Sequence, residues 1–536
     1  MKKQDNTRAL WLRLGAAAGG TALVLAAAAP AGADPANNTS AKLRQAVTSA
    51  GVMDHLENFQ SIANANAGTR ASGTPGYAAS RDYVVDRLEA AGYAPTVQEF
   101  DFPFYRELSP AVMNRVLPSP KTYVAGTDFA SMTYSGAGDV TAPVTPVQLT
   151  LPPTAPAGGT VSGCDAAAFA GFPAGNIALI QRGTCSFGVK AQLAQAAGAS
   201  AVVVMNEGQA GRTGPVAGTL GAPVVTIPVV GASYAVGVEL SAPGTTLHVK
   251  TDTESEIRKT WNVFAETAKG NDDNVVMAGA HLDSVVAGPG INDNGSGSGA
   301  LLEVAEQFAK TSPKNTTRFA WWGAEELGLL GSNHYIADLV ANDKPALEDI
   351  ALYLNFDMVG SPNYVRFVYD GDNSRFPVGP GAAKGPEGSG AIEDVFHDYF
   401  ASVNLPSEET AFSGRSDYGP FIAQGIPAGG LFTGAEGVKT AEQAAVFGGT
   451  AGVAYDRCYH QACDTIANVN VKAVDENSDA MAHALVTYAM STADVNGGKG
   501  RPVAPPGQHT DGTPVGAGTT SGGGLHDDHD HGGDHS

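Results

Sequence analysis

The chain has 536 residues, of which 43% are hydrophobic and 16% are charged, so its composition is globular and its length exceeds what one hydrophobic core supports. Its formal charge of −22 excludes nucleic acid and anionic membranes as partners, because both require a basic surface. We therefore expect two or three domains.

The first 33 residues have the pattern of an export signal. Four basic residues precede an apolar stretch over residues 14–30, and Ala31-Gly32-Ala33 is a small-residue cleavage site. A membrane anchor is the alternative, but the stretch is rich in Ala and Gly and short for a bilayer. We expect a secreted, extracellular protein with no membrane attachment once residues 1–33 are removed.

Two regions that differ in residue pattern follow the predicted signal. Residues 54–62 and 77–91 have helical periodicity, and residues 96–104 alternate as a strand does. From about residue 117 to 253 the chain is rich in Pro, Gly, Val and Thr. Short apolar runs lie there at 176–181, 201–205 and 223–230, with one predicted helix over 188–197. The composition of this second region predicts a compact β-rich domain.

After Trp261 strands and helices alternate. We predict strands over 275–280, 317–322 and 350–356, with helices over 300–310 and 327–339. This alternation predicts a parallel sheet with helices on both faces. The segment before the β-rich domain is too small to fold alone, so we expect it to belong to the sheet domain and the β-rich domain to be an insertion.

The composition changes again near the C-terminus. Residues 496–536 consist largely of Gly, Pro, Thr, Ser, Asp and His, which cannot bury a core, so we predict a disordered tail. A solvated tail without a specific role is the favoured interpretation. Weak scavenging of zinc by its His and Asp residues is the alternative.

The chain has four cysteines, and an exported protein is expected to pair them. We predict the local pairs Cys164 with Cys185 and Cys458 with Cys463. For the second pair the alternative is a structural zinc site formed by both cysteines and His460. Export favours the disulfide, whose main effect would be to fix the backbone around His460.

Metal-binding residue types follow each of the three predicted strands of the sheet domain. Carboxyl ends of neighbouring parallel strands meet at one edge, so these side chains should converge. Taken singly, each has a simpler explanation as a structural hydrogen-bonding group or a helix cap. Imidazole with several carboxylates suits zinc, and the excess of carboxylates suits two ions that share one of them. The residues are His281, Asp283, Glu325, Glu326 and Asp357, joined by Asp293 in a Gly-rich loop before a helix.

Seven segments together carry a family resemblance: AGAHLDSV, GPGINDNGSGSG, RFAWWGAEELGLLGS, YLNFDMVGSPN, GRSDYGPF, GGLFTG and DRCYHQACDT. They resemble the secreted bacterial two-zinc aminopeptidases of the aminopeptidase S and aminopeptidase Y type, also called bacterial leucyl aminopeptidases. The resemblance covers about residues 41–115 and 255–495. The segment NIALIQRGTCSFGVKAQLAQAAGASAVVVMNE is similar to the protease-associated domain inserted in such peptidases.

The resemblance implies an α/β fold of the zinc exopeptidase type, with a mixed, largely parallel sheet flanked by helices. Its catalytic domain would comprise residues 34–116 and 255–495, with the protease-associated domain at 117–254. It implies two zinc ions per chain and a set of roles. His281 and Asp357 would bind one zinc ion, Glu326 and His460 would bind the other, and Asp293 would bridge the two. Glu325 would be the general base, and Tyr459 would bind the oxyanion.

The resemblance also assigns outer positions. Asp283 would orient the first zinc-binding His from behind, and Arg415, Phe432 and Tyr459 would line the substrate pocket. Asp475 and Asp479 match part of a calcium site in the family, whose amino-terminal portion is not recognisable here.

These assignments predict hydrolysis of the N-terminal peptide bond of peptides and proteins with free N-termini. Large apolar N-terminal residues (Leu, Met, Phe) should be preferred, and a monomer is favoured. A carboxypeptidase or a single-zinc glutaminyl cyclase is the nearest rival, although a cyclase would usually lack one ligand set. No G-x-S-x-G or H-E-x-x-H motif occurs. A binding protein on a peptidase scaffold is the rival of a different class, and such proteins lose ligands or the base.

Overall fold

The computed structural model describes residues 36–153 and 156–497. The predicted signal and all but the first two residues of the predicted tail lie outside these residues. Within them, no helix combines the length and the apolar character needed to cross a membrane.

The strands form one hydrogen-bonded network. Its order is β13-β12-β14-β11-β9-β10-β8-β4-β5-β6-β7-β3, and β1 pairs with β2 and β8. The strands are β1 Thr96–Leu117, β2 Lys121–Thr122, β3 Phe129–Ser131, β4 Gly138–Val147, β5 Ile177–Gln181, β6 Ala201–Met205, β7 Val229–Ala232, β8 Thr246–Glu266, β9 Asn271–His281, β10 Asn315–Trp322, β11 Ile350–Phe356, β12 Phe367–Tyr369, β13 Glu408–Thr410 and β14 Ala428–Phe432.

Helices account for most of the remaining regular structure. They are α1 Ser40–Ala46, α2 Ser49–Ala65, α3 Pro75–Ala91, α4 Phe187–Ala196, α5 Tyr234–Leu240, α6 Gly297–Phe308, α7 Leu330–Asn342, α8 Lys344–Glu348, α9 Ser389–Ser402, α10 Tyr418–Ala423, α11 Ala441–Phe447, α12 Val471–Met490 and α13 Ala493–Asn496. Short helical turns are η1 Ala166–Phe169, η2 Ile291–Ser296, η3 Glu325–Leu327 and η4 Ile466–Asn468.

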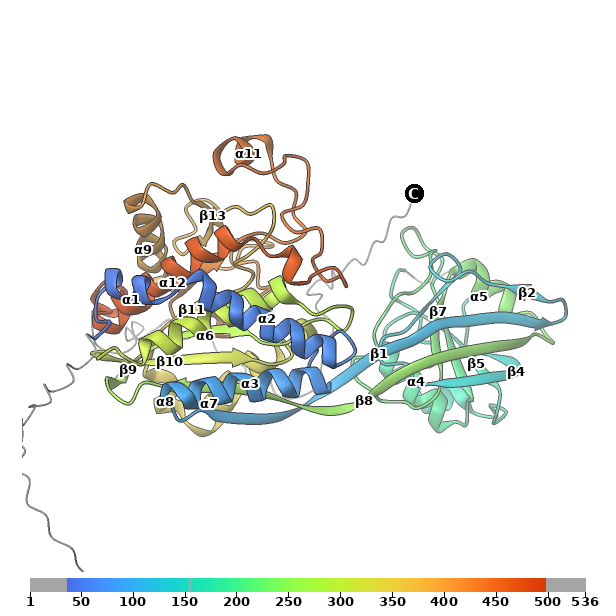
Figure 1. The fold of residues 1–536 in the computed structure, drawn as a ribbon. Helices are drawn as coiled ribbons and strands as arrows, with labels where there is room; N and C mark the ends of the chain where they lie inside the picture. The colour runs from blue at the N-terminus through green and yellow to red at the C-terminus, as the bar shows by residue number, and fades with distance from the viewer. Residues whose placement is uncertain (1–35, 154–155, 498–536) are drawn as a thin grey trace, which may run out of the picture. The chain divides into compact units, whose positions relative to one another are not determined.

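The catalytic part is built on the parallel strands β10, β9, β11 and β14. Every residue of β9 from Asn274 to His281 is buried, as expected for a central strand covered on both faces. One core packs these strands against α2, α3, α6 and α12, which lie together in Figure 1. A second core on the other face includes Trp322, Tyr353 and residues of α7 and α10. The predicted sheet with helices on both faces is confirmed.

Local sequence signals set the helix boundaries. For α3, the Thr74 side chain accepts a hydrogen bond from the Tyr77 amide, and Pro75 occupies the first turn, where its missing N–H costs nothing. The helix ends at Ala91, and the following Gly92 adopts the left-handed conformation that glycine tolerates best. These caps explain why the predicted bounds of 77–91 lie so close to the observed ones.

The inserted segment contains a second parallel block. Strands β4, β5, β6 and β7 pair in parallel, with α4 and α5 packed among them. The long strands β1 and β8 pair with each other, and β8 also pairs with β10 at one end and β4 at the other (Figure 1). Helix α5 was not predicted. Of the apolar run 223–230 only the last two residues enter a strand: β7 begins at Val229, directly after Pro228, which has no N–H to donate to a ladder.

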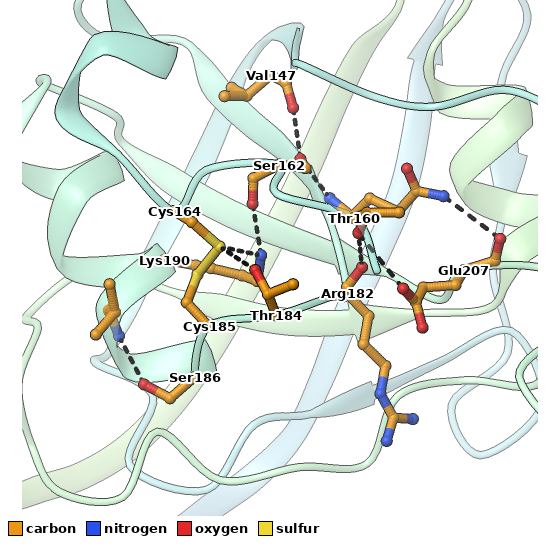
Figure 2. Close-up of a disulfide and its surroundings, with 12 residues drawn as sticks. Val147, Thr160, Ser162, Cys164, Arg182, Thr184, Cys185, Ser186, Lys190 and Glu207 are labelled. Carbon is orange, nitrogen blue, oxygen red and sulfur yellow. Dashed lines mark hydrogen bonds between the residues drawn. A yellow bond between two sulfur atoms is a disulfide. The ribbon is translucent and has the colours of Figure 1, made fainter. Parts of the chain in front are cut away.

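Both predicted disulfides are present. Cys164 pairs with Cys185 in the inserted segment, beside the buried Lys190, whose ammonium donates to the Ser162 carbonyl oxygen (Figure 2). Cys458 pairs with Cys463 in the catalytic part. A zinc site formed by both of these cysteines is therefore wrong.

Candidate active site

Three of the five predicted metal ligands come from the carboxyl ends of three adjacent parallel strands. Trp322, the last residue of β10, lies opposite His281 at the end of β9, and Asn355 near the end of β11 lies opposite Gly279. Asp357 follows β11 directly, and η3 begins at Glu325 after a turn at Ala324. The pairing register therefore delivers His281, the Glu325–Glu326 pair and Asp357 to one edge of the sheet.

Asp293 stands between two groups of these residues. The Nε2 atom of His281 lies 3.3 Å from Asp293 Oδ1 and 3.3 Å from Asp357 Oδ1. The Nε2 atom of His460 lies 3.2 Å from Asp293 Oδ2 and 2.9 Å from Glu326 Oε2. One carboxylate thus offers a separate oxygen atom to each group. This is the grouping that the resemblance implies for two ions.

The charge balance of the cluster calls for cations. Burial and the neighbouring Asp293 carboxylate raise the pKa of Glu326 to about 7. Oδ2 of Asp293 and Oε1 of Glu326 are buried without a hydrogen-bond partner. Buried carboxylates are stable when they are paired or coordinate metal, and imidazole nitrogen with carboxylate oxygen is a donor set that zinc accepts. The residues present therefore fit a pair of zinc ions.

Glu325 is placed differently from its neighbour Glu326. Its Oε2 atom lies 3.9 Å from His281 Nε2, on the side of Asp357, whereas Glu326 faces His460. Burial raises the pKa of Glu325 above its usual range. Ala324 precedes the pair with φ +56°, so the backbone turns sharply and the adjacent side chains diverge. The two carboxylates can therefore serve different roles.

His460 is held by a loop that is fastened at both ends. The Cys458–Cys463 disulfide closes the loop, and His460 itself adopts φ +58°, which is uncommon for a residue with a side chain. Just beyond the disulfide, both carboxylate oxygens of Asp464 accept backbone N–H groups, those of Asn292 and Asp293. The loop that carries His460 is thereby joined to the loop that carries the bridging Asp293.

The predicted pocket residues lie in two places. The ring of Tyr459 stacks on that of His460, with centroids 3.8 Å apart. Arg415 donates to the Tyr459 hydroxyl at 3.1 Å and to Glu436 at 2.7 Å. Phe432, at the end of β14, stacks on Phe367, which lines a cavity of about 730 Å³.

The contacts of Asp283 and of the residues predicted for calcium differ in detail from the expectation. The Nδ1 atom of His281 lies 3.1 Å from the backbone carbonyl of Asp283 and 3.7 Å from its carboxylate, which instead accepts the Glu325 N–H. Asp475 and Asp479 both lie on α12, and Asp479 forms an ion pair with Arg44 at 3.3 Å. An arginine therefore neutralises one of the two carboxylates proposed for calcium.

Residues outside the predicted set also support the site. Ser416 donates to Asp357 at 2.6 Å, and Asp417 accepts a hydrogen bond from Ser332 while its Oδ2 atom is buried without a partner. Ser416, Asp417 and Asp464 all lie inside the segments that carry the family resemblance, so the sequence contained a signal for them. Arg70 contacts the segment between His281 and Asp293 from outside those seven segments, and no sequence signal pointed to it.

A mostly parallel sheet with a histidine- and carboxylate-rich cluster at its C-terminal edge defines a metal-dependent hydrolase. Comparison with known proteins gives the family. The model of peptidase family M28 matches residues 262–485, and that of the PA domain matches residues 140–240. The chain is 49% identical over 463 residues to an aminopeptidase of Pseudomonas aeruginosa, which covers 86% of this chain and 84% of that protein. It therefore belongs to peptidase family M28, and it is an aminopeptidase.

Other relatives agree. The chain is 47% identical over 338 residues to leucine aminopeptidase 2 of Trichophyton rubrum, covering 62% of this chain and 65% of that protein. The solved aminopeptidase from Aneurinibacillus sp. strain AM-1 has a TM-score of 0.56 at 25% identity, over 87% of this chain and 97% of that one. A zinc aminopeptidase from Bacillus subtilis has the same fold, with a TM-score of 0.52 at 22% identity over 85% and 98% of the chains.

Proposed function

We propose that this chain removes N-terminal residues at a site for two zinc ions that share Asp293. His281 and Asp357 would hold one ion, and His460 and Glu326 the other. The observation that carries the proposal is the position of Asp293, whose two carboxylate oxygens lie 3.3 Å and 3.2 Å from the two imidazoles. When bound there, the ions supply the Lewis acidity that lets a water molecule ionise near neutral pH.

Glu325 is suited to move the proton. It is almost fully buried, and its carboxylate lies on the His281 and Asp357 side of the cluster. As general base it would accept a proton from the attacking water and return it to the amine that leaves when the peptide bond breaks. Its backbone N–H is fixed by the Asp283 carboxylate at 3.2 Å, which limits where its side chain can reach.

Tyr459 is suited to stabilise negative charge on the scissile carbonyl oxygen. Because Arg415 donates to the phenol oxygen, the phenol proton is free to point toward another acceptor. Burial raises the pKa of Tyr459 above its usual range, so the phenol keeps this proton at neutral pH. A donor held in place before the reaction is the kind of group that stabilises an oxyanion.

We also propose a preference for large apolar N-terminal residues and a secreted location. Phe432 next to Phe367 provides apolar surface at the end of β14, and a relative carries the name leucine aminopeptidase. The two disulfides and the signal-like N-terminus favour export. The substrates would then be extracellular peptides and proteins with free N-termini.

A panel of aminoacyl chromogenic substrates tests the function and the preference together. We expect Leu, Met and Phe substrates to be cleaved fastest, and an N-acetylated Leu substrate to resist cleavage because the site carboxylates would hold a free amine. Chelator-treated protein should be inactive and should recover with zinc. Full activity of metal-stripped protein contradicts the two-zinc proposal, whereas faster cleavage of acidic or basic substrates contradicts only the preference.

A further inference from the structure

Arg70 lies in the connection between α2 and α3, far from the metal ligands in sequence, and its side chain is completely buried. A buried guanidinium is costly unless its N–H groups are satisfied and its charge is balanced. The contacts of the Arg70 side chain therefore indicate which part of the structure it stabilises.

All of the hydrogen bonds of the Arg70 guanidinium go to one loop. Nη1 donates to the Leu282 carbonyl at 2.5 Å, Nε to that of Pro289 at 2.8 Å, and Nη2 to that of Gly290 at 2.6 Å. The backbone N–H of Arg70 also donates to Ser284 Oγ at 3.0 Å. This loop begins next to His281 and ends three residues before Asp293, so Arg70 joins the two ends of the segment between two predicted ligands.

The charge of Arg70 is placed among the acids of the site. Burial lowers its pKa to about 10, and the carboxylates of Asp283, Asp464 and Asp293 oppose this shift, so the side chain stays cationic at neutral pH. Its guanidinium also lies 5.0 Å from the ring centroid of Phe59 on α2. The cation thus connects the N-terminal helices to the acidic centre.

We propose that Arg70 is a positioning residue of the metal centre, which sets the spacing between His281 and Asp293 by holding the loop 282–290 at both ends. This inference rests on the proposed two-zinc site. The planar fork of a guanidinium donates to three carbonyl oxygens from three different nitrogens, whereas the three N–H groups of a lysine ammonium share one nitrogen and cannot reach carbonyls in this arrangement. Arginine at this position is therefore required by geometry as well as by charge.

Arg366 offers a matched control. It is also buried, at 4% exposure, it donates to the carbonyl of Pro406, and it forms an ion pair with Glu476 at 2.6 Å. None of these partners is a predicted metal ligand. Replacing it should cost stability of a similar kind without disturbing the loop 282–290.

The test compares Arg70→Met and Arg366→Met in the full chain. Zinc retained against a graded series of chelator concentrations, the thermal midpoint, and kcat and KM with excess zinc are measured for each. We expect both variants to melt earlier, but only Arg70→Met to release zinc at chelator concentrations at least about tenfold lower. Its kcat should fall more than its KM rises, since ligand spacing governs turnover more than substrate contact. Equal zinc retention by both variants overturns the proposal.

Arg70→Lys decides the matter if the methionine variant does not fold. It keeps the charge but cannot hold three carbonyls, so its zinc retention should still fall below that of the wild-type chain. Wild-type zinc retention in Arg70→Lys overturns the proposal. A wild-type chain that binds no zinc would instead refute the proposed function itself, so the two failures are distinguishable.

Discussion

Two regions of this chain place a glutamate just after a buried parallel strand, and they treat it in opposite ways. In the inserted segment Glu207 follows β6 and its side chain is 0% exposed, while in the catalytic part Glu326 follows β10 and is 7% exposed. Arg212 pairs with Glu207 at 2.7 Å and the Gly158 N–H donates to it at 2.8 Å. Figure 2 shows Glu207 beside Thr160, whose hydroxyl oxygen lies 3.5 Å from Oε1 of Glu207.

Among the described residues no arginine pairs with Glu326, and its ion-pair partner is instead His460, whose Nε2 atom lies 2.9 Å from Oε2. Its Oε1 atom is buried without a hydrogen bond, and its other oxygen faces His460 beside the Asp293 carboxylate. A buried carboxylate must be compensated, either by a cation of the chain or by one from solution. A buried glutamate after a parallel strand is therefore structural at Glu207, where an arginine compensates its charge, and at Glu326 it fits the metal site proposed above.

The largest expected effect separates Glu326 from its neighbour Glu325. Glu325→Gln should keep both zinc ions but lose roughly 10²–10⁴ in turnover, because an amide cannot accept the proton of water. Glu326→Gln should lose one zinc as well as activity, because it removes an anionic ligand. Zinc content and turnover of both variants are the measurements. Loss of zinc from Glu325→Gln with two ions kept by Glu326→Gln would reverse the two roles.

Sequence patterns predicted the convergence of the proposed ligands at one edge of the sheet better than they predicted the inserted fold. His281, Glu326 and Asp357 follow buried strands, and parallel pairing brings strand ends together whatever their separation in the sequence. His460 follows no strand, and only the family resemblance identified it. The helix α5 and the loss of strand at 223–228 escaped prediction because short apolar runs do not distinguish strand from coil without their partners.

The role proposed for Arg70 was not predicted from the sequence, for a different reason. A lone arginine in a polar connection is indistinguishable in sequence from a solvated one, and its role depends on carbonyl groups some 210–220 residues further along the chain. Backbone acceptors carry no sequence signature. Contacts of this kind become visible only in the folded structure.

The two disulfides extend the comparison and should give opposite rankings for stability and activity. Cys164–Cys185 spans 21 residues and Cys458–Cys463 spans 5, so loop entropy predicts that their removal costs about 3 and about 2 kcal/mol respectively. Replacing Cys458 and Cys463 by serine frees the loop that holds His460. We therefore expect the smaller loss of stability to come with the larger loss of activity and zinc.

Thermal midpoints, zinc content and turnover of the two double variants check this ranking. Replacement of Cys164 and Cys185 serves as the control, because no predicted ligand lies in that loop. Equal turnover of the two variants at a temperature where both are folded would show that the disulfide does not position His460.

The smallest expected effect is a change of stability alone, in Glu207→Gln. The amide oxygen can replace Oε2, which accepts from both Arg212 and the Gly158 N–H, but it carries no charge, and a buried charged hydrogen bond is worth about 2 kcal/mol. Asp139→Asn is the matched control, because Asp139 pairs with His248 at 2.8 Å but is 64% exposed, so its replacement should leave stability unchanged. Denaturant midpoints, zinc content and turnover on a Leu substrate are compared for both. Because Arg212 already compensates Glu207, neither variant should change zinc content or turnover. A loss of zinc from Glu207→Gln would mean that its carboxylate also takes part in metal binding, and the contrast with Glu326 would fail.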